Sequence, residues 1–260
     1  MKCNICSGET LPFQQAMVRE KYSVQYFCCP NCGFIQTESP YWLGEAYTEA
    51  INTSDVGLVA RNLETARVTK AVISVFFKSA AKFVDYGGGY GLFVRLLRDS
   101  GFDFYRYDTF CANLFAHGLD VIASELQKYE LVTAFEVFEH LVDPMQDIAA
   151  IGKFSENILF TTNIPPTPPP SLENWWYYGL DHGQHVSLYS LTSLSVVAAQ
   201  LNLHLYSNRV NLHLLTKQVI LSPLFRFVVS GPGSTLLNLV VRRRSLIAAD
   251  YFRISGRKLE

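Results

Sequence analysis

The stretch Val84-Asp85-Tyr86-Gly87-Gly88-Gly89-Tyr90-Gly91 separates an apolar run from the apolar-rich segment 92–97. This order predicts a buried strand, a glycine-rich turn and the first residues of a helix. Glycines suit such a turn because its backbone takes positive φ angles and approaches a ligand closely, while N–H groups at the helix start point at the ligand. The stretch therefore predicts an α/β fold with a cofactor-binding turn.

The spacing of the glycines indicates which cofactor the turn binds. A dinucleotide-binding fold has the pattern G-x-G-x-x-G, but the last glycine of that pattern would fall on Leu92. The turn instead places an acid at the end of the strand and a glycine at every second position after it. This form suits S-adenosylmethionine, whose α-amino group is cationic and which has no pyrophosphate. We therefore expect S-adenosylmethionine to contact Asp85, Gly87, Gly88, Gly89 and Gly91.

Length and composition fit an α/β enzyme with one small additional module. The chain has 260 residues, of which 49% are hydrophobic, so it can bury a full α/β core. Its formal net charge of −1 gives no field that favours nucleic acid or an anionic membrane, and a polyanionic substrate is not expected. Cys3 and Cys6 occupy the place of a signal peptide, so we expect a cytoplasmic protein.

Four of the six cysteines form two pairs with metal-ligand spacing, Cys3-x-x-Cys6 and Cys29-x-x-Cys32. Each pair puts two thiolates on one tight turn, and two such turns can complete a tetrahedral structural zinc site. The alternatives are a reduced thiol cluster or a disulfide pair, which a cytoplasmic location disfavours. Cys28 adjoins a ligand but lacks the spacing. We predict a zinc ribbon over 1–40, with a short strand at 22–27, that binds RNA, binds a partner protein or covers the main domain.

After the glycine turn, strands and helices alternate. We predict strands at 104–107, 119–123, 131–135 and 157–161, a helix at 191–201, and two strands over 202–216. Asp108 follows the second of the parallel strands, where an acid can accept hydrogen bonds from both ribose hydroxyls. The alternative is an aspartate that only stabilises a turn. The proline-rich segment 164–170 is expected to be a loop.

The segments on either side of this core are expected to be helical. Residues 41–77 form a helical lid or connector, interrupted at Asn52-Thr53-Ser54-Asp55 by capping residues. Residues 218–260 form a C-terminal helical extension in which proline and glycine break the apolar run, so no spanning helix is expected. With Arg242-Arg243-Arg244 the extension could touch an anionic membrane surface, although packing against the core or a second subunit is favoured.

The turn at 84–91, Asp108 and the segment Glu136-Val137-Phe138-Glu139-His140, followed by Asp143-Pro144, together resemble the class I S-adenosylmethionine-dependent methyltransferases. The resemblance covers residues 57–217. It implies a Rossmann-like seven-stranded methyltransferase sheet that ends in an antiparallel hairpin, with a methyltransferase domain at 78–217. It also places Phe135, Glu136 and His140 in the cofactor site, with His140 as a hydrogen-bonded scaffold residue rather than the base.

With its ribbon, the chain is similar to methyltransferases of sugar C-methylation and of polysaccharide biosynthesis. The sugar C-methyltransferases carry a further C-terminal domain that this sequence does not contain, so transfer to a sugar hydroxyl is as plausible as transfer to carbon. We therefore expect a small-molecule sugar or glycan intermediate as the acceptor. The alternatives are an RNA methyltransferase that uses the ribbon to hold its substrate, which the charge disfavours, and a cofactor-fold module without catalysis.

Methyl transfer requires an aligned acceptor and a group that removes its proton. The segment Trp175-Trp176-Tyr177-Tyr178-Gly179-Leu180-Asp181-His182-Gly183-Gln184-His185 follows the last parallel strand, at the sheet edge where α/β folds bind ligands. We expect Trp176 and Tyr177 to stack on a sugar, and His182 or His185 to act as general base. Structural loop histidines, or a metal site formed by Asp181, His182 and His185, are the alternatives.

Overall fold

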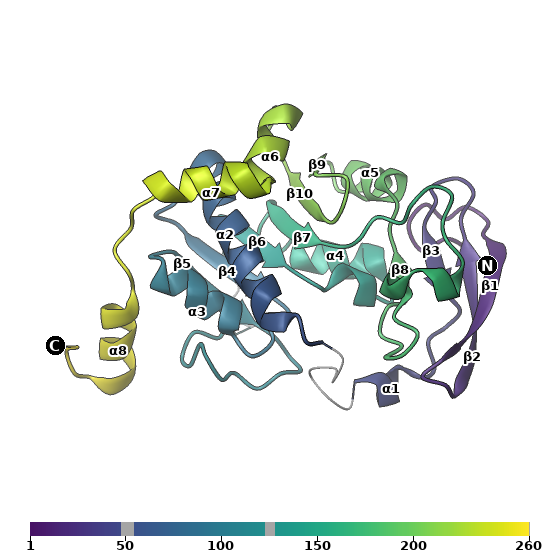
Figure 1. Ribbon diagram of the computed structural model, residues 1–260, viewed down its shortest axis with the longest axis horizontal. Coiled ribbons are helices and arrows are strands. Elements are labelled where there is room, and N and C mark those ends of the chain that lie inside the picture. The colour runs from purple at the N-terminus through teal and green to yellow at the C-terminus, as the bar shows by residue number, and fades with distance from the viewer. Residues whose placement is uncertain (48–54, 123–127, 260) are drawn as a thin grey trace. The chain divides into compact units, whose positions relative to one another are not determined.

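The computed structural model describes residues 1–47, 55–122 and 128–259, and it divides into two compact units (Figure 1). Unit 1 comprises Met1–Asn52, Phe135–Ala150 and Phe160–Gln218. Unit 2 comprises Thr53–Ala134, Ile151–Leu159 and Val219–Glu260. Each unit is therefore assembled from three separate segments of the chain.

A mixed sheet of six strands confirms the predicted α/β fold. Its order is β5-β4-β6-β7-β10-β9, with β4 parallel to both β5 and β6, and β9 antiparallel to β10. The strands are β4 (Lys82–Tyr86), β5 (Asp103–Tyr107), β6 (Leu131–Ala134), β7 (Ile158–Thr161), β9 (His204–Ser207) and β10 (Leu212–Thr216). Parallel strands with buried side chains on both faces have continuous apolar sequences, which is why β6 and β7 could be located from sequence.

The described residues show six strands in this sheet, whereas seven were expected. The expected strand at 119–123 forms one isolated parallel bridge, between Arg106 and Asp120. Backbone hydrogen bonds run from Arg106 N to Leu119 O (2.9 Å) and from Val121 N to Arg106 O (2.7 Å). Ala123, the last residue of the expected strand, lies outside the described residues.

Most α-helices of the described chain belong to unit 2. They are α2 (Leu58–Phe76), α3 (Leu92–Asp99), α6 (Ser222–Val229), α7 (Gly231–Val240) and α8 (Ile247–Ser255). Of these, α3 packs against β5. Both α6 and α7 pack against α2, as Figure 1 shows at its upper edge. The helix α8 is fixed by a buried ion pair between Asp250 and Arg98, with oxygen and nitrogen 2.6 Å apart. Much of the described part of residues 219–255 is thus helical.

The helical segment expected at 41–77 contains a short α1 (Leu43–Ala46) in unit 1 and the long α2 in unit 2. The predicted interruption at Asn52-Thr53-Ser54 lies outside the described residues. Asp55, the last residue of that interruption, pairs with Arg61 through two hydrogen bonds of 3.0 and 2.7 Å. Its carboxylate is therefore held beside the first turn of α2, where the helix dipole favours an acid.

Unit 1 contains a second sheet of four strands, in the order β1-β2-β3-β8. These are β1 (Leu11–Val18), β2 (Tyr22–Cys28), β3 (Ile35–Thr37) and β8 (Ser187–Leu188). The predicted strand at 22–27 is confirmed as β2. Residues on this sheet share one buried apolar cluster with Trp42, Tyr177 and Tyr178. The N-terminal sheet and the segment around Tyr177 therefore form a single core.

The remaining elements of the chain are short. They are α4 (Pro144–Ile151), α5 (Leu191–Gln200), and the 3-10 helices η2 (Phe138–His140), η3 (Leu172–Asn174) and η4 (Trp176–Tyr178). The helix predicted at 191–201 is confirmed as α5, which begins with a capping box formed by Ser190 and Ser193. Within the described ranges, we find no helix that is both long and apolar enough to cross a bilayer.

Candidate functional site

The glycine turn of unit 2 joins β4 to α3, as the sequence predicts. The N–H groups of Gly87 and Gly88 donate to Tyr107 O at 2.8 and 3.3 Å, which fixes the turn to the end of β5. Gly91 has a φ of +86°, and a Cβ there would lie 2.8 Å from the Cβ of Ala116. Both its conformation and this contact require glycine at the start of α3.

Two residues at the end of β5 hold Gly89 through both of its backbone groups. Arg106 Nε donates to Gly89 O at 2.6 Å, and Gly89 N donates to Asp108 Oδ2 at 2.9 Å. Asp108 Oδ1 also accepts from the N–H groups of Phe110 and Cys111, both at 2.7 Å. Asp108 therefore stabilises the turn, and its expected bonds to ribose stay a prediction. Arg106, which the sequence analysis missed, also binds Asp120 at 2.5 Å.

The space beside Gly89 is compatible with a ligand. Its φ is +52°, and a Cβ built there would meet no atom within 4 Å. The helix α3 that follows has no side-chain cap, so N–H groups of its first turn are available to a bound group. An open, rigid backbone next to an uncapped helix start fits the cofactor that the sequence predicts for this turn.

Asp85 lies under the turn and is 4% exposed. Thr133 Oγ1 donates to its Oδ1 at 2.6 Å. Loss of hydration raises the pKa of Asp85 to about 7, although the Thr133 bond opposes this shift. The carboxyl oxygen also lies 3.0 Å from where a Cβ of residue 88 would be, which explains the glycine at that position. Asp85 thus lies beneath the backbone of the turn, against Gly88.

The raised pKa of Asp85 predicts how stability depends on pH. Between its unfolded pKa of about 3.9 and its folded pKa of about 7, the folded state binds more protons than the unfolded state. Ionisation of Asp85 therefore lowers the free energy of unfolding as pH rises through this window. Asp85→Asn removes this contribution. Relative to wild type, it should gain on the order of 1.4 kcal/mol per pH unit between about pH 5 and 7.

Urea unfolding of both proteins across this pH range measures the difference. The matched control is Glu173→Gln, which removes an exposed carboxyl instead of a buried one. A pH-independent difference for Asp85→Asn would contradict the assignment.

Phe135 and Glu136 follow β6 and belong to unit 1. Phe135 is half-buried. Glu136 has a φ of +54°, which is unfavourable for a residue with a side chain. Two hydrogen bonds of 2.9 Å join it to Thr161, whose Oγ1 accepts from Glu136 N and donates to Glu136 Oε1. Strain of this kind concentrates at functional sites. The expected contacts of Phe135 and Glu136 with the cofactor stay predictions.

The histidine loop (residues 179–185) is held from three sides within unit 1. Arg19 N, from the turn between β1 and β2, donates to Leu180 O at 2.7 Å. From the other side, Trp42 Nε1 donates to Gly183 O and Gln184 Nε2 donates to Ala46 O, both at 2.7 Å. After the loop, Val186 N donates to Glu139 O at 2.9 Å. The loop is therefore a rigid part of the unit 1 core.

The hydrogen bonds of the two loop histidines distinguish them. Tyr177 O lies 2.6 Å from His185 Nδ1, and because a carbonyl only accepts, Nδ1 carries the proton and Nε2 has the available lone pair. His182 Nδ1 accepts from Gln184 N at 3.1 Å, so neutral His182 carries its proton on Nε2. Of the two imidazoles, His185 offers the nitrogen that can take a proton.

Burial shapes the protonation of these rings. Loss of hydration lowers the pKa of His185 well below its usual range, and the neighbouring His140 and His182 lower it further. Loss of hydration, together with the neighbouring His182, also lowers the pKa of His140, to about 4. The ring centroids of His140 and His185 are 5.0 Å apart, and His140 Nδ1 lies 3.1 Å from Tyr47 Oη. Both imidazoles are therefore neutral at pH 7.

The two aromatic residues expected at the acceptor site have different environments. Trp176 is 77% exposed. Tyr177 is fully buried, and its ring packs against His185 with centroids 4.7 Å apart. Trp176 packs edge-on against Tyr177 at 5.3 Å. Trp176 is thus the member of this pair whose face is accessible, while Tyr177 supports the histidine.

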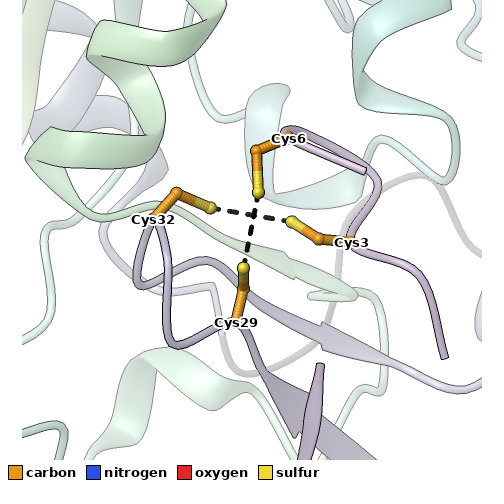
Figure 2. A group of neighbouring side chains, drawn as sticks. All are labelled: Cys3, Cys6, Cys29 and Cys32. Atoms are coloured by element: carbon orange, nitrogen blue, oxygen red, sulfur yellow. Dashed lines mark hydrogen bonds between the residues drawn. The ribbon is translucent and has the colours of Figure 1, made fainter. Parts of the chain in front are cut away.

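The four cysteines predicted to bind zinc converge on one point, as Figure 2 shows. Cys3 Sγ lies 3.6 Å from Cys32 Sγ, and Cys6 Sγ lies 3.5 Å from Cys29 Sγ. Four sulfurs each about 2.3 Å from a zinc ion would be about 3.8 Å apart. The hydrogen bond to Cys32 lowers the pKa of the Cys3 thiol to about 5. The cluster therefore has the size and the donors of a tetrahedral zinc site.

The two cysteine turns have matching backbone geometry. Ser7 N donates to Cys3 O at 2.9 Å, and Gly33 N donates to Cys29 O at 2.8 Å. Ser7 and Gly33, which follow the second cysteine of each pair, have φ values of +58° and +69°. Each turn thus directs two sulfurs to the same side.

Glu139, His140 and His185 form the other metal-competent group among the described residues. The trio of Asp181, His182 and His185 that the sequence suggested is not such a group in the described part of the chain. Sequence reasoning singled out neither Glu139 nor Tyr47 as a site residue. The signal for Glu139 was its position next to His140, because these two residues of metal-ligand type stood side by side in the most family-specific motif. Tyr47 lay in the segment expected to be a helical lid or connector, where its role was left open.

Comparison with known proteins identifies the family. The profile of the methyltransferase domain family matches residues 59–208. A comparison with curated protein sequences finds no match.

Several solved structures resemble the chain at low sequence identity. An O-methyltransferase family protein from Burkholderia thailandensis is 13% identical, over 68% of this chain and 67% of that chain, with a TM-score of 0.42. Human N-acetylserotonin methyltransferase in complex with SAM is 14% identical over 68% and 66%, with a TM-score of 0.40. The plantazolicin methyltransferase BpumL, in complex with a monoazolic desmethylPZN analog and SAH, is 12% identical over 69% and 94%, with a TM-score of 0.46. Values this low say nothing about the acceptor.

Proposed function

Because the chain belongs to the methyltransferase domain family and is an S-adenosylmethionine-dependent methyltransferase, we propose that it methylates a hydroxyl of a sugar or sugar-bearing small molecule. The observation that carries this proposal is the contact series from exposed Trp176 through buried Tyr177 to His185. An indole face stacks well on the apolar face of a sugar ring. The same series leads from that face to an imidazole with an available nitrogen.

The glycine turn is proposed to hold S-adenosylmethionine. Gly89 leaves the backbone accessible, Gly88 and Gly91 allow the close packing of the turn, and Arg106 and Asp108 fix its conformation. Gly87 is kept with them as a proposed contact. When bound, the sulfonium supplies an activated methyl group. Phe135, Glu136 and His140 are kept as further cofactor residues, on the family resemblance alone.

His185 is proposed as the residue at which the acceptor hydroxyl loses its proton. Its Nδ1–H is held by Tyr177 O, so the ring cannot rotate and Nε2 has a fixed direction. His182 is set aside as the base because its Nδ1 already accepts a bond and its Nε2 carries the proton. With S-adenosylmethionine bound, the oxygen would attack the methyl carbon in line with the S–CH₃ bond, so that the O–CH₃ bond would form as the S–CH₃ bond breaks and S-adenosylhomocysteine would leave.

The cysteine cluster is proposed to bind one structural zinc ion through Cys3, Cys6, Cys29 and Cys32. Four thiolates fill a tetrahedral site and leave no position for substrate. The sheet that carries these turns shares its core with the histidine loop. The role of the ion is therefore to stabilise unit 1, including the residues around His185.

A cofactor titration and a transfer assay test the proposal together. The purified chain should bind S-adenosylhomocysteine in preference to NAD, and it should transfer a methyl group to one or more nucleotide sugars. Asp108→Ala should weaken S-adenosylhomocysteine binding about 5- to 150-fold, the equivalent of 1–3 kcal/mol for a buried polar group left unpaired. Asp99→Ala, on α3 but away from the turn, is the matched control.

Mass spectrometry of the products identifies the acceptor. Preference for NAD would contradict the cofactor assignment. Methylation of RNA without methylation of nucleotide sugars would contradict the acceptor class.

Location and membrane contact stay predictions. We keep the cytoplasm as the expected compartment. The exposed apolar residues on α6 and α7, such as Phe227 and Leu239, stand near Arg242-Arg243-Arg244 in sequence. This combination supports peripheral contact with an anionic bilayer surface, for which co-sedimentation with anionic vesicles is the direct test.

A further inference from the structure

Glu139, His140 and His185 bring three metal-ligand side chains together apart from the cysteine cluster. Ligand atoms of the three all lie within 4.8 Å of one another. Glu139 and His140 are neighbours in η2, and His185 ends the histidine loop. The hydrogen bond from Val186 N to Glu139 O, at 2.9 Å, joins the two segments directly beside the ligands. A second bond, from Ser187 Oγ to Leu141 O at 2.6 Å, fixes them further.

The hydrogen bonds behind the two imidazoles match those of metal-binding histidines. A ligating histidine usually donates its other ring N–H to an oxygen, which fixes the ring and its tautomer. His185 donates Nδ1–H to Tyr177 O at 2.6 Å. His140 Nδ1 lies 3.1 Å from Tyr47 Oη, which can accept a hydrogen bond. His185 can therefore present Nε2 as a ligand, and His140 can do so in the tautomer whose Nδ1–H donates to Tyr47 Oη.

Burial gives a cation a further reason to bind here. Glu139 is fully buried, and His185 is 8% exposed. A buried carboxylate costs several kcal/mol in lost hydration, and an adjacent cation offsets this cost. Ligands about 2.1 Å from one ion lie roughly 3–3.5 Å apart, so movement of the Glu139 and His140 side chains by about 1–2 Å would complete the site.

We infer that Glu139, His140 and His185 bind one divalent cation, which activates the acceptor hydroxyl of the proposed reaction. Two imidazoles and one carboxylate suit Mn²⁺, Fe²⁺ or Zn²⁺, and they leave coordination positions open for an oxygen ligand. A hydroxyl next to the ion loses its proton to solvent more readily, because the ion stabilises the resulting oxygen anion. With the ion bound, His185 Nε2 is a ligand and the proton leaves to solvent, whereas without the ion His185 Nε2 takes the proton as proposed above. The methyl acceptor is the same oxygen in both cases.

The inference rests on the proposed function only for the role of the ion, so the test measures binding. Mn²⁺ is the probe because it prefers nitrogen and oxygen donors to the thiolates of the cysteine cluster. Electron paramagnetic resonance of the full chain should detect one bound Mn²⁺. Glu139→Gln and His140→Ala should each weaken binding at least tenfold. Asp181→Asn and His182→Ala should keep it, since neither residue belongs to this group.

Wild-type data alone can overturn the inference, so folding of the variants is not decisive. Absence of Mn²⁺ binding to the wild type, together with unchanged methyl transfer after chelation, would overturn it. Loss of binding in Asp181→Asn but not in Glu139→Gln would do so too, by favouring the neighbouring trio. A different acceptor class would leave Mn²⁺ binding unchanged, so failure of the proposed function is distinguishable from failure of the metal site.

Discussion

Cys29→Ser should abolish stoichiometric zinc binding and unfold the N-terminal sheet. A serine hydroxyl is a poor replacement for a thiolate, and structural zinc contributes an apparent binding free energy of roughly 10–16 kcal/mol in small domains. Cys29 Sγ lies 3.5 Å from Cys6 Sγ in the cluster, so its replacement leaves three thiolates for the ion. Elemental analysis should give about one zinc per wild-type chain and close to none in the variant.

Cys28→Ser is the matched control, because it changes the neighbouring cysteine. Cys28 ends β2 and lies outside the metal-competent group of four. It should keep zinc and stability. Loss of the metal in Cys28→Ser with retention in Cys29→Ser would reverse the ligand assignment.

Loss of zinc should also reduce turnover, although the four proposed ligands lie outside the histidine loop. The N-terminal sheet contains β8, which starts two residues after His185, and it shares a core with Tyr177. Affinity for S-adenosylhomocysteine, whose glycine turn belongs to unit 2, should change much less in Cys29→Ser.

His185→Ala should lower turnover by about 10² to 10⁴, the usual contribution of a group that removes a proton in the transition state. His185 is the loop histidine whose Nε2 is available, since its Nδ1–H is bound to Tyr177 O at 2.6 Å. Cofactor affinity should stay close to that of wild type. Methyl transfer to nucleotide sugars and titration with S-adenosylhomocysteine measure the two quantities separately.

His182→Ala is the control for this experiment, because it removes a ring from the same loop. Neutral His182 has no available lone pair, so its removal should reduce turnover much less. Gly179, below its ring, takes a φ of +61° and would clash with it if it had a Cβ, only 2.4 Å from His182 Cε1. Equal losses in the two variants would show that the loop acts only through its structure.

The parallel strands, the glycine turn and the hairpin could be predicted because their signals are local. Buried parallel strands are continuous apolar runs, as in β6 and β7. The predicted bounds of α5 agree with the structure to within one residue. The strand expected at 119–123 shows the limit of this approach. An apolar run indicates a possible strand, but it does not show whether that segment pairs with its neighbour through more than one bridge.

Contacts between distant segments could not be predicted. β8 has only two residues and no pattern of its own, and its pairing with β3 makes it a strand. Asp108 was placed correctly after β5, but its bonds to the N–H groups of Gly89, Phe110 and Cys111 depend on the closed turn. Likewise, the tautomers that separate His182 from His185 follow from backbone partners which only the folded loop supplies.

The pairing of β3 with β8 determines when the N-terminal sheet can be completed during synthesis of the chain. About 150 residues separate Thr37 from Ser187, so the N-terminal sheet stays incomplete until most of the chain has been synthesised. At 5–20 residues per second, this delay is roughly 8–30 s. During it, the edge of β3 has no partner strand, and unpaired edges invite association with other chains. The cysteine turns, complete by residue 33, could bind zinc from the start of this interval, so the ion would hold the unfinished sheet together while its last strand is still being translated.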